Sequence, residues 1–174
     1  SDKISLINAL TSVGIKRIEV ASFVHPKLVP QMADAEVVVA GLPSNNEITY
    51  IGLTLNMRGL YRALETRTAI SGINEIGCVV LPSDTFGVKN QGQTSAESIK
   101  TAIEILKTAK KEGMPAQVTI SASCGCPFEG EVSAKKIVEI AREVANAGPV
   151  EIAIADTIGV GVPSQVFDLF SAVK

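Results

Sequence analysis

Apolar residues in this chain alternate between short unbroken runs, typical of buried strands, and runs with the period of a helix. Each apolar run ends in polar or glycine- and proline-rich residues before the next amphipathic segment begins. We expect strands at 18–24, 49–55, 75–81, 117–122 and 151–155. We expect helices at 2–13, 31–40, 58–65, 95–112 and 133–147, and one from residue 163 onward, with a polar loop at 85–93.

Local signals fix several of the predicted helix ends. Gly14 and Gly41 follow the last apolar positions of the first two helices, where glycine commonly ends a helix. Thr94 and Glu97 have the spacing of a capping box, and Ser133 precedes another helical run. Pro163 is suited to a first helical turn. The helices therefore have start and stop signals independent of their apolar periodicity.

Strict alternation of strand and helix with short loops predicts an α/β fold with parallel strands and right-handed crossovers. No Gly-x-Gly-x-x-Gly motif follows any strand, so a barrel is favoured over a dinucleotide-binding fold. A closed (β/α)8 TIM barrel takes about 250 residues. We therefore expect residues 1–174 to form a single incomplete TIM-barrel domain with about five strands. In barrels, the residues at the carboxyl ends of the strands form the active site. Polar residues of this chain cluster at those ends: Ser22, Asn56, Ser83, Asp84, Ser121, Asp156 and Thr157.

Composition narrows the classes of function. Apolar residues make up 46% of the chain and charged residues 20%, a composition that suits an α/β domain. The net charge is -2, and the sequence has no basic stripe that could bind nucleic acid or an anionic membrane. No apolar run is long enough for a membrane helix. We therefore expect no nucleic-acid or membrane partner.

Three cysteines without a Cys-x-x-Cys pair favour a reducing compartment. Cys124 and Cys126 form a Cys-x-Cys motif, which is a weak metal or redox signal, and small buried thiols are the simpler interpretation. With one histidine in the chain, His25, a Cys/His zinc site would lack ligands. Glu19 is a charged residue within the first predicted strand. Two interpretations of its side chain are open: a surface carboxylate and an active-site carboxylate.

Five motifs together resemble one known family. They are the stretch 18–34 (Ile-Glu-Val-Ala-Ser-Phe-Val-His-Pro-Lys-Leu-Val-Pro-Gln-Met-Ala-Asp), Leu53-Thr-Leu-Asn56, Lys89-Asn90, Ser121 with the stretch 125–130 (Gly-Cys-Pro-Phe-Glu-Gly), and the stretch 156–161 (Asp-Thr-Ile-Gly-Val-Gly). In register over essentially the whole chain, they resemble the 3-hydroxy-3-methylglutaryl-CoA (HMG-CoA) lyases of the DRE-TIM metallolyase superfamily. The resemblance implies a carbon–carbon lyase that cleaves HMG-CoA to acetyl-CoA and acetoacetate.

The resemblance also implies roles for individual residues. Glu19 and Asp156 match active-site carboxylates of the family and are the expected catalytic residues. The expected contacts to the acyl-CoA substrate come from five further positions: Ser22, Asn56, Lys89, Asn90 and Thr157. The family uses a divalent cation, Mg²⁺ or Mn²⁺, held by an Asp, a His-x-His pair and an Asn. This chain contains none of those segments, so we expect no metal ligand in it.

Several alternatives stay open on the sequence. A Schiff-base aldolase would need a lysine in or at the end of a strand, and no predicted strand carries one. A synthase of the same superfamily is a nearer rival. A third alternative is a catalytically incompetent barrel fragment whose free sheet edges self-associate as a homo-oligomer. The resemblance also implies a role in leucine catabolism and ketone body metabolism, in the cytoplasm or in mitochondria, with the cytoplasm favoured.

Overall fold

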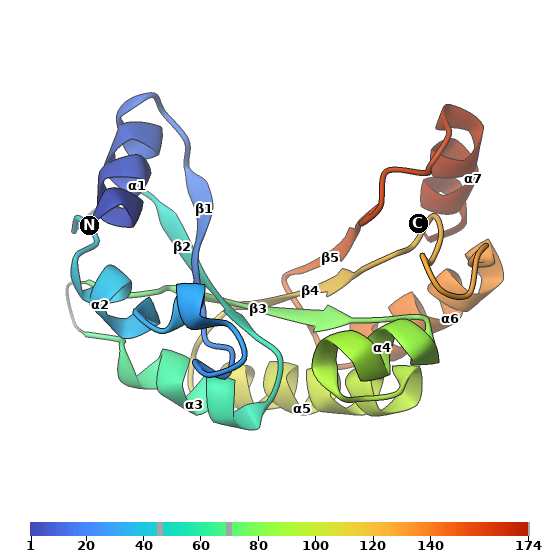
Figure 1. Ribbon diagram of the computed structural model, residues 1–174, viewed down its shortest axis with the longest axis horizontal. Coiled ribbons are helices and arrows are strands. Elements are labelled where there is room, and N and C mark those ends of the chain that lie inside the picture. The colour runs from blue at the N-terminus through green and yellow to red at the C-terminus, as the bar shows by residue number, and fades with distance from the viewer. Residues whose placement is uncertain (45–46, 69–70, 174) are drawn as a thin grey trace. The chain divides into compact units, whose positions relative to one another are not determined.

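The computed structural model describes residues 1–44, 47–68 and 71–173, in which strands and helices alternate (Figure 1). The strands are parallel and follow the order β1-β2-β3-β4-β5 in one sheet. Their bounds are β1 Arg17–Ser22, β2 Thr49–Thr54, β3 Glu75–Val80, β4 Ala116–Ile120 and β5 Glu151–Ile154. The helices are α1 Asp2–Ser12, α2 Ala35–Ala40, α3 Met57–Glu65, α4 Asp84–Gln91, α5 Ser95–Lys111, α6 Ala134–Ala145 and α7 Pro163–Val173, with a 3₁₀ turn at Pro30–Met32. The predicted α/β fold of five parallel strands is confirmed.

The chain divides into two compact units. The first unit comprises residues 1–77 and 109–116, and the second comprises residues 78–108 and 117–174. Strand β3 and helix α5 each contribute residues to both units. That residues 1–174 act as one incomplete barrel domain stays a prediction.

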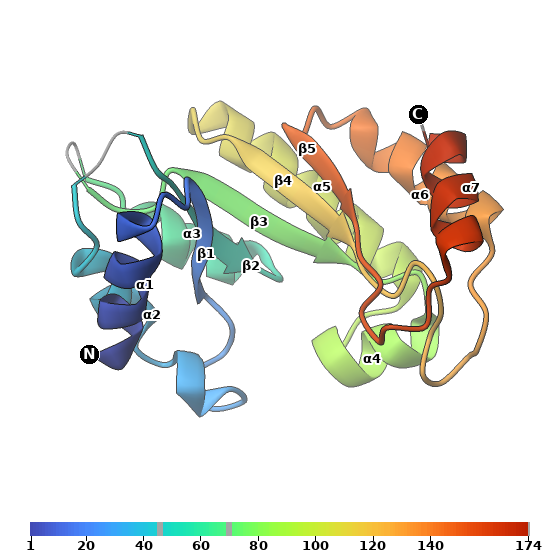
Figure 2. The same cartoon turned by 90° about the horizontal axis from the view of Figure 1, so that it is seen from above.

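In the first unit, β1 and β2 pair in parallel from Arg17 opposite Thr49 to Ser22 opposite Leu53. The register shifts between Glu19 and Ala21, where β1 has an irregularity. Helix α2 packs on β1 and α3 packs on β2, and Figure 2 shows α1 and α2 beside β1. Large side chains that are almost fully buried form the core of this unit: Phe23, Val38, Val39, Leu60, Ile73 and Ile76. This core holds the carboxyl ends of β1 and β2 in fixed positions.

In the second unit, β4 and β5 pair in parallel from Gln117 opposite Glu151 to Ile120 opposite Ile154, and α6 packs against α7. The Cys78 thiol lies in the core of this unit and donates a hydrogen bond to the Gln117 carbonyl oxygen at 3.3 Å. Burial raises the pKa of Cys78 to about 12. Other large apolar side chains of this unit are almost fully buried as well: Val80, Leu81, Ile105, Leu106, Ile120 and Ile137.

Two sequence predictions about helices were wrong. Residues 85–93 are not a loop, because α4 covers most of them: Ser83 Oγ accepts a hydrogen bond from Phe86 N at 3.2 Å, and Gly92, at φ 70°, ends the helix. The helix predicted at 31–40 is split into the 3₁₀ turn and the short α2. The two pieces are separated at Asp34, the residue before α2, whose φ of -98° and ψ of 17° are not helical.

The helix caps expected at Thr94 and Ser133 are confirmed. Thr94 N donates to Glu97 Oε2 at 2.8 Å, and Glu97 N donates to Thr94 Oγ1 at 3.3 Å, which completes the capping box of α5. Ser133 Oγ accepts from Lys136 N at 3.3 Å at the start of α6. These local signals could be read from sequence because both partners lie within one helical turn.

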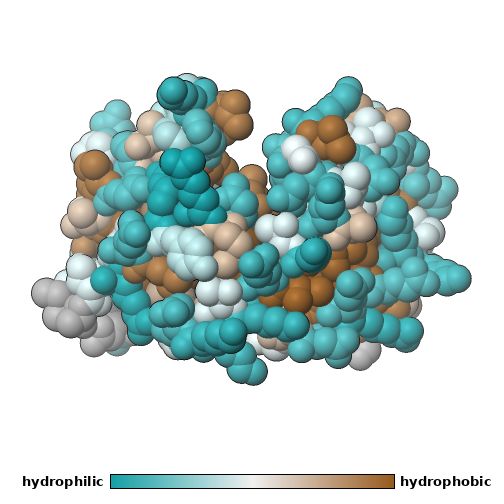
Figure 3. All heavy atoms as spheres, turned by 90° about the horizontal axis from the view of Figure 1, so that it is seen from below, coloured by the Kyte–Doolittle hydropathy of each residue, from teal (hydrophilic) through white to brown (hydrophobic). Residues whose placement is uncertain are grey.

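The surface is mainly hydrophilic on the face shown in Figure 3, with hydrophobic patches between the polar side chains. In the second unit, large apolar side chains gather in the exposed part of the segment from 158 to 170. The exposed members of this group are Ile158, Val160, Val162, Val166, Phe167 and Phe170. Among the described residues, no helix is long and apolar enough to cross a membrane.

Gly59 in α3 lies where a side chain would collide with the backbone of the first unit. A Cβ atom at this position would come within 2.8 Å of the Phe23 carbonyl oxygen. Alanine stabilises a helix by about 1 kcal/mol relative to glycine, but we expect the collision to destabilise the fold by more than this gain. Gly59→Ala should therefore lower the free energy of unfolding by about 1–3 kcal/mol in urea titrations. As a control, Glu65→Ala in the exposed last turn of α3 should change it by less than about 0.5 kcal/mol. An unchanged or increased stability of Gly59→Ala would contradict the close approach.

Candidate active site

Glu19 lies in the middle of β1 and borders an apolar hollow of about 190 Å³ in the first unit. Leu6 and Leu10 of α1 and Val38 of α2 are among the side chains that line this hollow. The residue as a whole is exposed, but the apolar surroundings remove part of the water from its carboxyl group. This burial raises the pKa of Glu19 above its ordinary value. Within the described part of the chain, Glu19 has no hydrogen bond or ion pair, so its carboxyl group is available to exchange a proton.

Ser22 and Asn56 lie at neighbouring strand ends of the first unit. Ser22 is the last residue of β1, and its buried Oγ finds no hydrogen-bond partner in the described residues. Buried polar atoms usually have a partner, so this hydroxyl is available for a ligand or a water molecule. Asn56 follows β2 and caps α3, because its Oδ1 accepts a hydrogen bond from Gly59 N at 2.9 Å. The structure therefore brings these two predicted residues to the same edge of the β1–β2 pair.

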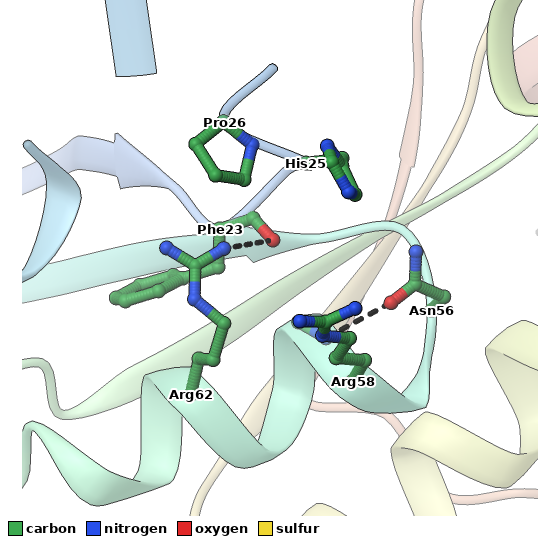
Figure 4. A pocket seen from close by; sticks show the side chains of 7 residues that line it. Phe23, His25, Pro26, Asn56, Arg58 and Arg62 are labelled. Carbon is green, nitrogen blue, oxygen red and sulfur yellow. Dashed lines mark hydrogen bonds between the residues drawn. The ribbon is translucent and has the colours of Figure 1, made fainter. Parts of the chain in front are cut away.

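A hollow of about 160 Å³ opens beside Asn56 (Figure 4). One of its walls is Arg62, which is held from several sides: Nη1 donates to the Val24 carbonyl oxygen at 3.0 Å, and Nη2 lies 2.7 Å from Glu36 Oε1. Its guanidinium carbon also lies 5.7 Å from the centre of the Phe23 ring. The side chains that line the hollow come from the loop after β1 and from the start of α3: Phe23, His25, Pro26, Asn56, Arg58, Gly59 and Arg62.

Lys89 and Asn90 lie in the last turn of α4, in the second unit, and both are exposed. The Lys89 ammonium nitrogen is 4.1 Å from the centre of the Phe128 ring, and Phe128 also packs edge-on against Phe86. Glu129 Oε1 accepts from Thr85 N at 2.7 Å and ties the loop after β4 to the start of α4. Lys89 is therefore positioned by the loop that contains Phe128 and keeps its charge at the surface.

Asp156 and Thr157 follow β5 and organise the loops of the second unit. Asp156 Oδ2 accepts from Gly161 N at 2.7 Å, and its Oδ1 accepts from Val160 N at 3.2 Å. Thr157 Oγ1 accepts from Ala122 N at 2.8 Å. Ala122 has φ of 52°, a conformation that residues with a side chain rarely adopt, so this bond holds a strained residue at the end of β4. Both predicted site residues thus have structural partners as well as exposed polar atoms.

The Cys-x-Cys motif contains two buried free thiols, which agrees with the simpler interpretation of the sequence. Burial, and then the negative charge of Asp156, raise the pKa of Cys124. Burial acts to raise the pKa of Cys126 too, but its hydrogen bond with Ser83 and those from backbone amides lower it below the ordinary value overall. Cys126 Sγ lies 3.0 Å from Ser83 Oγ, so the motif joins the loops after β3 and β4.

Glu19, Ser22 and Asn56 belong to the first unit, whereas Lys89, Asn90, Asp156 and Thr157 belong to the second. That all seven share one rim stays a prediction. Arg58 and Arg62 in the hollow were missed by sequence reasoning, although an arginine one turn into a helix that follows a strand end was a usable signal.

In the described part of the chain, no group of three or more His, Cys, Asp or Glu side chains could hold a metal ion.

The sequence profile of the HMGL-like family matches residues 1–174. The chain belongs to this family. Among its relatives is the mitochondrial hydroxymethylglutaryl-CoA lyase of Bos taurus, which is 37% identical over 98% of this chain and 51% of the relative. Curated lyases of the HMGL-like kind include forms named mitochondrial and forms named cytoplasmic.

Solved structures of HMG-CoA lyases have the same fold as this HMGL-like chain. The Bacillus subtilis lyase superposes with a TM-score of 0.92 at 34% identity, over 99% of this chain and 56% of that one. The Acinetobacter baumannii lyase, solved in complex with coenzyme A and 3-methylmalate, superposes with a TM-score of 0.90 at 34% identity, over 98% of this chain and 54% of that one. The chain spans about half the length of the relatives that it matches.

Proposed function

We propose that this chain serves in the cleavage of HMG-CoA to acetyl-CoA and acetoacetate. The observation that supports the proposal most is its similarity, over 98–99% of its length, to proteins named HMG-CoA lyases. Those relatives are named as lyases, which cleave carbon–carbon bonds, and not as synthases. The lyase is therefore favoured over the synthase alternative. The same reaction would give the protein a role in leucine catabolism and ketone body formation, and we favour a cytoplasmic location.

The proposed reaction is a retro-aldol cleavage. The tertiary hydroxyl of the substrate loses its proton to a base, and its oxygen forms the carbonyl of acetoacetate. The adjacent carbon–carbon bond breaks, and its electron pair passes to the departing acetyl-CoA as an enolate. A proton delivered to the enolate carbon gives acetyl-CoA. The protein must therefore accept one proton and supply another, which general acid–base groups accelerate by about 10²–10⁴-fold each.

In this proposal Glu19 and Asp156 handle the protons. Glu19 suits this role because its carboxyl group has no partner in the described residues and its pKa is raised toward the working pH. Asp156 is exposed at the end of β5, and its two oxygens are oriented by the amides of Val160 and Gly161. We further propose that the reaction uses Mg²⁺ or Mn²⁺.

Contacts to the acyl-CoA substrate are assigned to the five other predicted residues. Ser22 offers a buried hydroxyl without a partner, and Lys89 offers a surface cation suited to a phosphate. Asn56 and Asn90 offer amide groups, and Thr157 can still donate its hydroxyl proton while its oxygen accepts from Ala122 N. Each of these groups supplies hydrogen bonds that a thioester with carboxylate and phosphate groups could accept.

A hybrid lyase tests the proposed function. Residues 1–174 would replace the matched segment of the Bacillus subtilis lyase, and HMG-CoA cleavage would be measured with Mg²⁺, with Mn²⁺ and with a chelator. We expect metal-dependent cleavage by the hybrid and none by residues 1–174 alone. The unmodified lyase is the positive control, and circular dichroism and gel filtration verify that the hybrid is folded. A folded hybrid without activity would contradict the proposed function.

A second candidate, self-association, is favoured by exposed apolar side chains in the second unit. Phe167 is 72% exposed and Phe170 is 49% exposed on α7, and the residues of β5 are only half-buried. Exposed apolar side chains and an edge strand can each pair with another copy of a chain. We propose that residues 1–174 form homo-oligomers at micromolar concentration. A clean monomer in light scattering would contradict this, and Phe167→Ser should shift the distribution toward monomer.

A further inference from the structure

The side chain of Arg62 on α3 is bonded to two neighbouring segments of the first unit. Its Nη1 donates to the Val24 carbonyl oxygen at 3.0 Å and to the Phe23 carbonyl oxygen at 3.3 Å (Figure 4). Its Nε donates to Glu36 Oε1 at 2.8 Å, and its Nη2 lies 2.7 Å from the same oxygen. One planar guanidinium therefore joins α2, α3 and the chain that leaves β1, and an ammonium group could not make all four bonds, because it has three protons.

The backbone that Arg62 contacts comes directly after Ser22, the last residue of β1. Phe23 N donates to the Leu53 carbonyl oxygen on β2 at 2.8 Å, and the Phe23 side chain is buried. The Arg62 guanidinium carbon lies 5.7 Å from the centre of the Phe23 ring. Phe23 is thus fixed at its amide, its ring and its carbonyl group. Because Ser22 and Phe23 share a peptide bond, the direction of the Ser22 side chain depends on these contacts.

A contribution to stability alone does not account for this arrangement. The side chains of Arg62 and Glu36 are 23% and 44% exposed, and an ion pair with this much access to water contributes only about 0–1 kcal/mol. The Ser22 hydroxyl, in contrast, is buried and has no partner among the described residues. A contact between such a group and a ligand is sensitive to a displacement of about 1 Å. The contacts of Arg62 therefore matter most where the end of β1 meets a ligand.

We propose that Arg62 is a positioning residue that, together with Glu36, fixes the chain leaving β1 and so holds the Ser22 hydroxyl in place to bind substrate. The inference rests on the proposed function, because that function assigns Ser22 to the acyl-CoA substrate. Arg62 itself does not touch the reacting atoms. Its loss should therefore weaken substrate binding and leave the chemical step nearly unchanged.

Steady-state kinetics of Arg62→Ala in the hybrid lyase test this role. We expect KM for HMG-CoA to rise by about tenfold or more, and kcat to change by less than about twofold. Arg67→Ala is the matched control. Exposed Arg67 also donates to a backbone carbonyl oxygen, that of Glu112 at 3.0 Å, and none of its described bonds reaches the chain after β1. An unchanged KM in Arg62→Ala, or a loss confined to kcat, would overturn the proposal.

A double-mutant cycle tests the part assigned to Glu36. Glu36→Ala should raise KM less than Arg62→Ala does, because Arg62 keeps its two carbonyl bonds. In the double variant Glu36→Ala should add nothing to the effect of Arg62→Ala, since the two side chains act through one contact. Additive effects on KM would show that Glu36 does not act through Arg62.

Rescue by free guanidinium separates positioning from a general loss of stability. Arg62→Ala leaves a space beside Glu36, the two carbonyl oxygens and the Phe23 ring, and guanidinium has the shape and the donors of the lost group. Millimolar guanidinium chloride should lower the raised KM of Arg62→Ala, whereas sodium chloride at the same concentration should not. Ser22→Ala should show a raised KM that guanidinium does not lower. Because guanidinium otherwise weakens folding, a merely destabilised variant would gain nothing from it, and absence of rescue would overturn the proposal.

Hydrogen exchange on residues 1–174 gives a readout that requires no activity. The Phe23 amide is bonded to β2, and the Leu28 and Val29 amides donate to the His25 carbonyl oxygen at 2.9 and 3.1 Å. In Arg62→Ala these three amides should exchange about tenfold faster or more, relative to the amides of β2, and guanidinium should slow them again. Unchanged exchange, or an equal increase in β2, would contradict a positioning role. An inactive parent hybrid would count against the proposed function alone, because the exchange result does not depend on it.

Discussion

Glu19→Gln in the hybrid lyase is expected to lower kcat for HMG-CoA cleavage by at least about 100-fold, because glutamine keeps the size of the side chain but cannot exchange a proton. The apolar hollow beside β1 raises the pKa of the Glu19 carboxyl group, which matches the role of a proton carrier. The measurement is steady-state turnover with KM determined separately. A kcat close to that of the parent hybrid would remove Glu19 from the chemistry.

The same substitution should leave folding intact or improve it slightly. Because the pKa of Glu19 is raised in the folded chain, the folded state holds this proton more tightly than the unfolded state. The contribution of Glu19 to stability is therefore complete below the unfolded pKa and is lost as the pH rises through the folded pKa. Glu19→Gln removes that loss, so urea titrations of residues 1–174 at neutral pH should show no decrease in stability. A large decrease would indicate a structural role for the carboxylate.

Asp156→Asn is expected to have the second-largest effect, again with kcat in the hybrid lyase reduced by about 100-fold or more. Asparagine keeps one oxygen for the Val160 and Gly161 amides, so the loop should lose only one of its two bonds, about 1 kcal/mol of stability. The two roles of Asp156 are thereby separated. The kcat measures the contribution of its carboxylate to the reaction, and the urea titration measures the contribution of its hydrogen bonds to the stability of the loop.

The control for Asp156→Asn is Ile158→Ala in the same loop. Ile158 is exposed and none of the described hydrogen bonds involves its side chain, so this variant should keep both turnover and stability. If Asp156→Asn retained the kcat of the parent hybrid, Asp156 would be a residue that orders the loop and takes no part in proton transfer.

The sequence predicted the five strands and their parallel alternation with helices because each strand is a short, mainly apolar run bounded by polar residues. It missed α4, whose apolar positions Phe86 and Val88 do not form a helical stripe. Helix α4 depends instead on Ser83 at its start and on Glu129, which lies 44 residues beyond Thr85. Contacts between residues so distant in the chain cannot be read from local periodicity.

The candidate site could be predicted in part. Sequence motifs located Glu19, Asp156 and the polar strand ends, but they did not show that Asp156 accepts two backbone bonds in its own loop. They did not indicate that His25, which is exposed, lines the hollow beside Asn56. Its place there depends on the turn in which His25 Nδ1 accepts a hydrogen bond from Lys27 N.

Labelling of the buried Cys78 thiol can measure how readily the core of the second unit opens to solvent. A thiol with a pKa of about 12 is ionised in only about one molecule in 10⁴ at pH 8, and the thiolate is the form that alkylating reagents attack. Modification of Cys78 therefore has to wait until the sheet opens and returns the thiol to water. The rate at which iodoacetamide labels it, set against the rate for an unfolded peptide, gives the free energy of that opening without added denaturant.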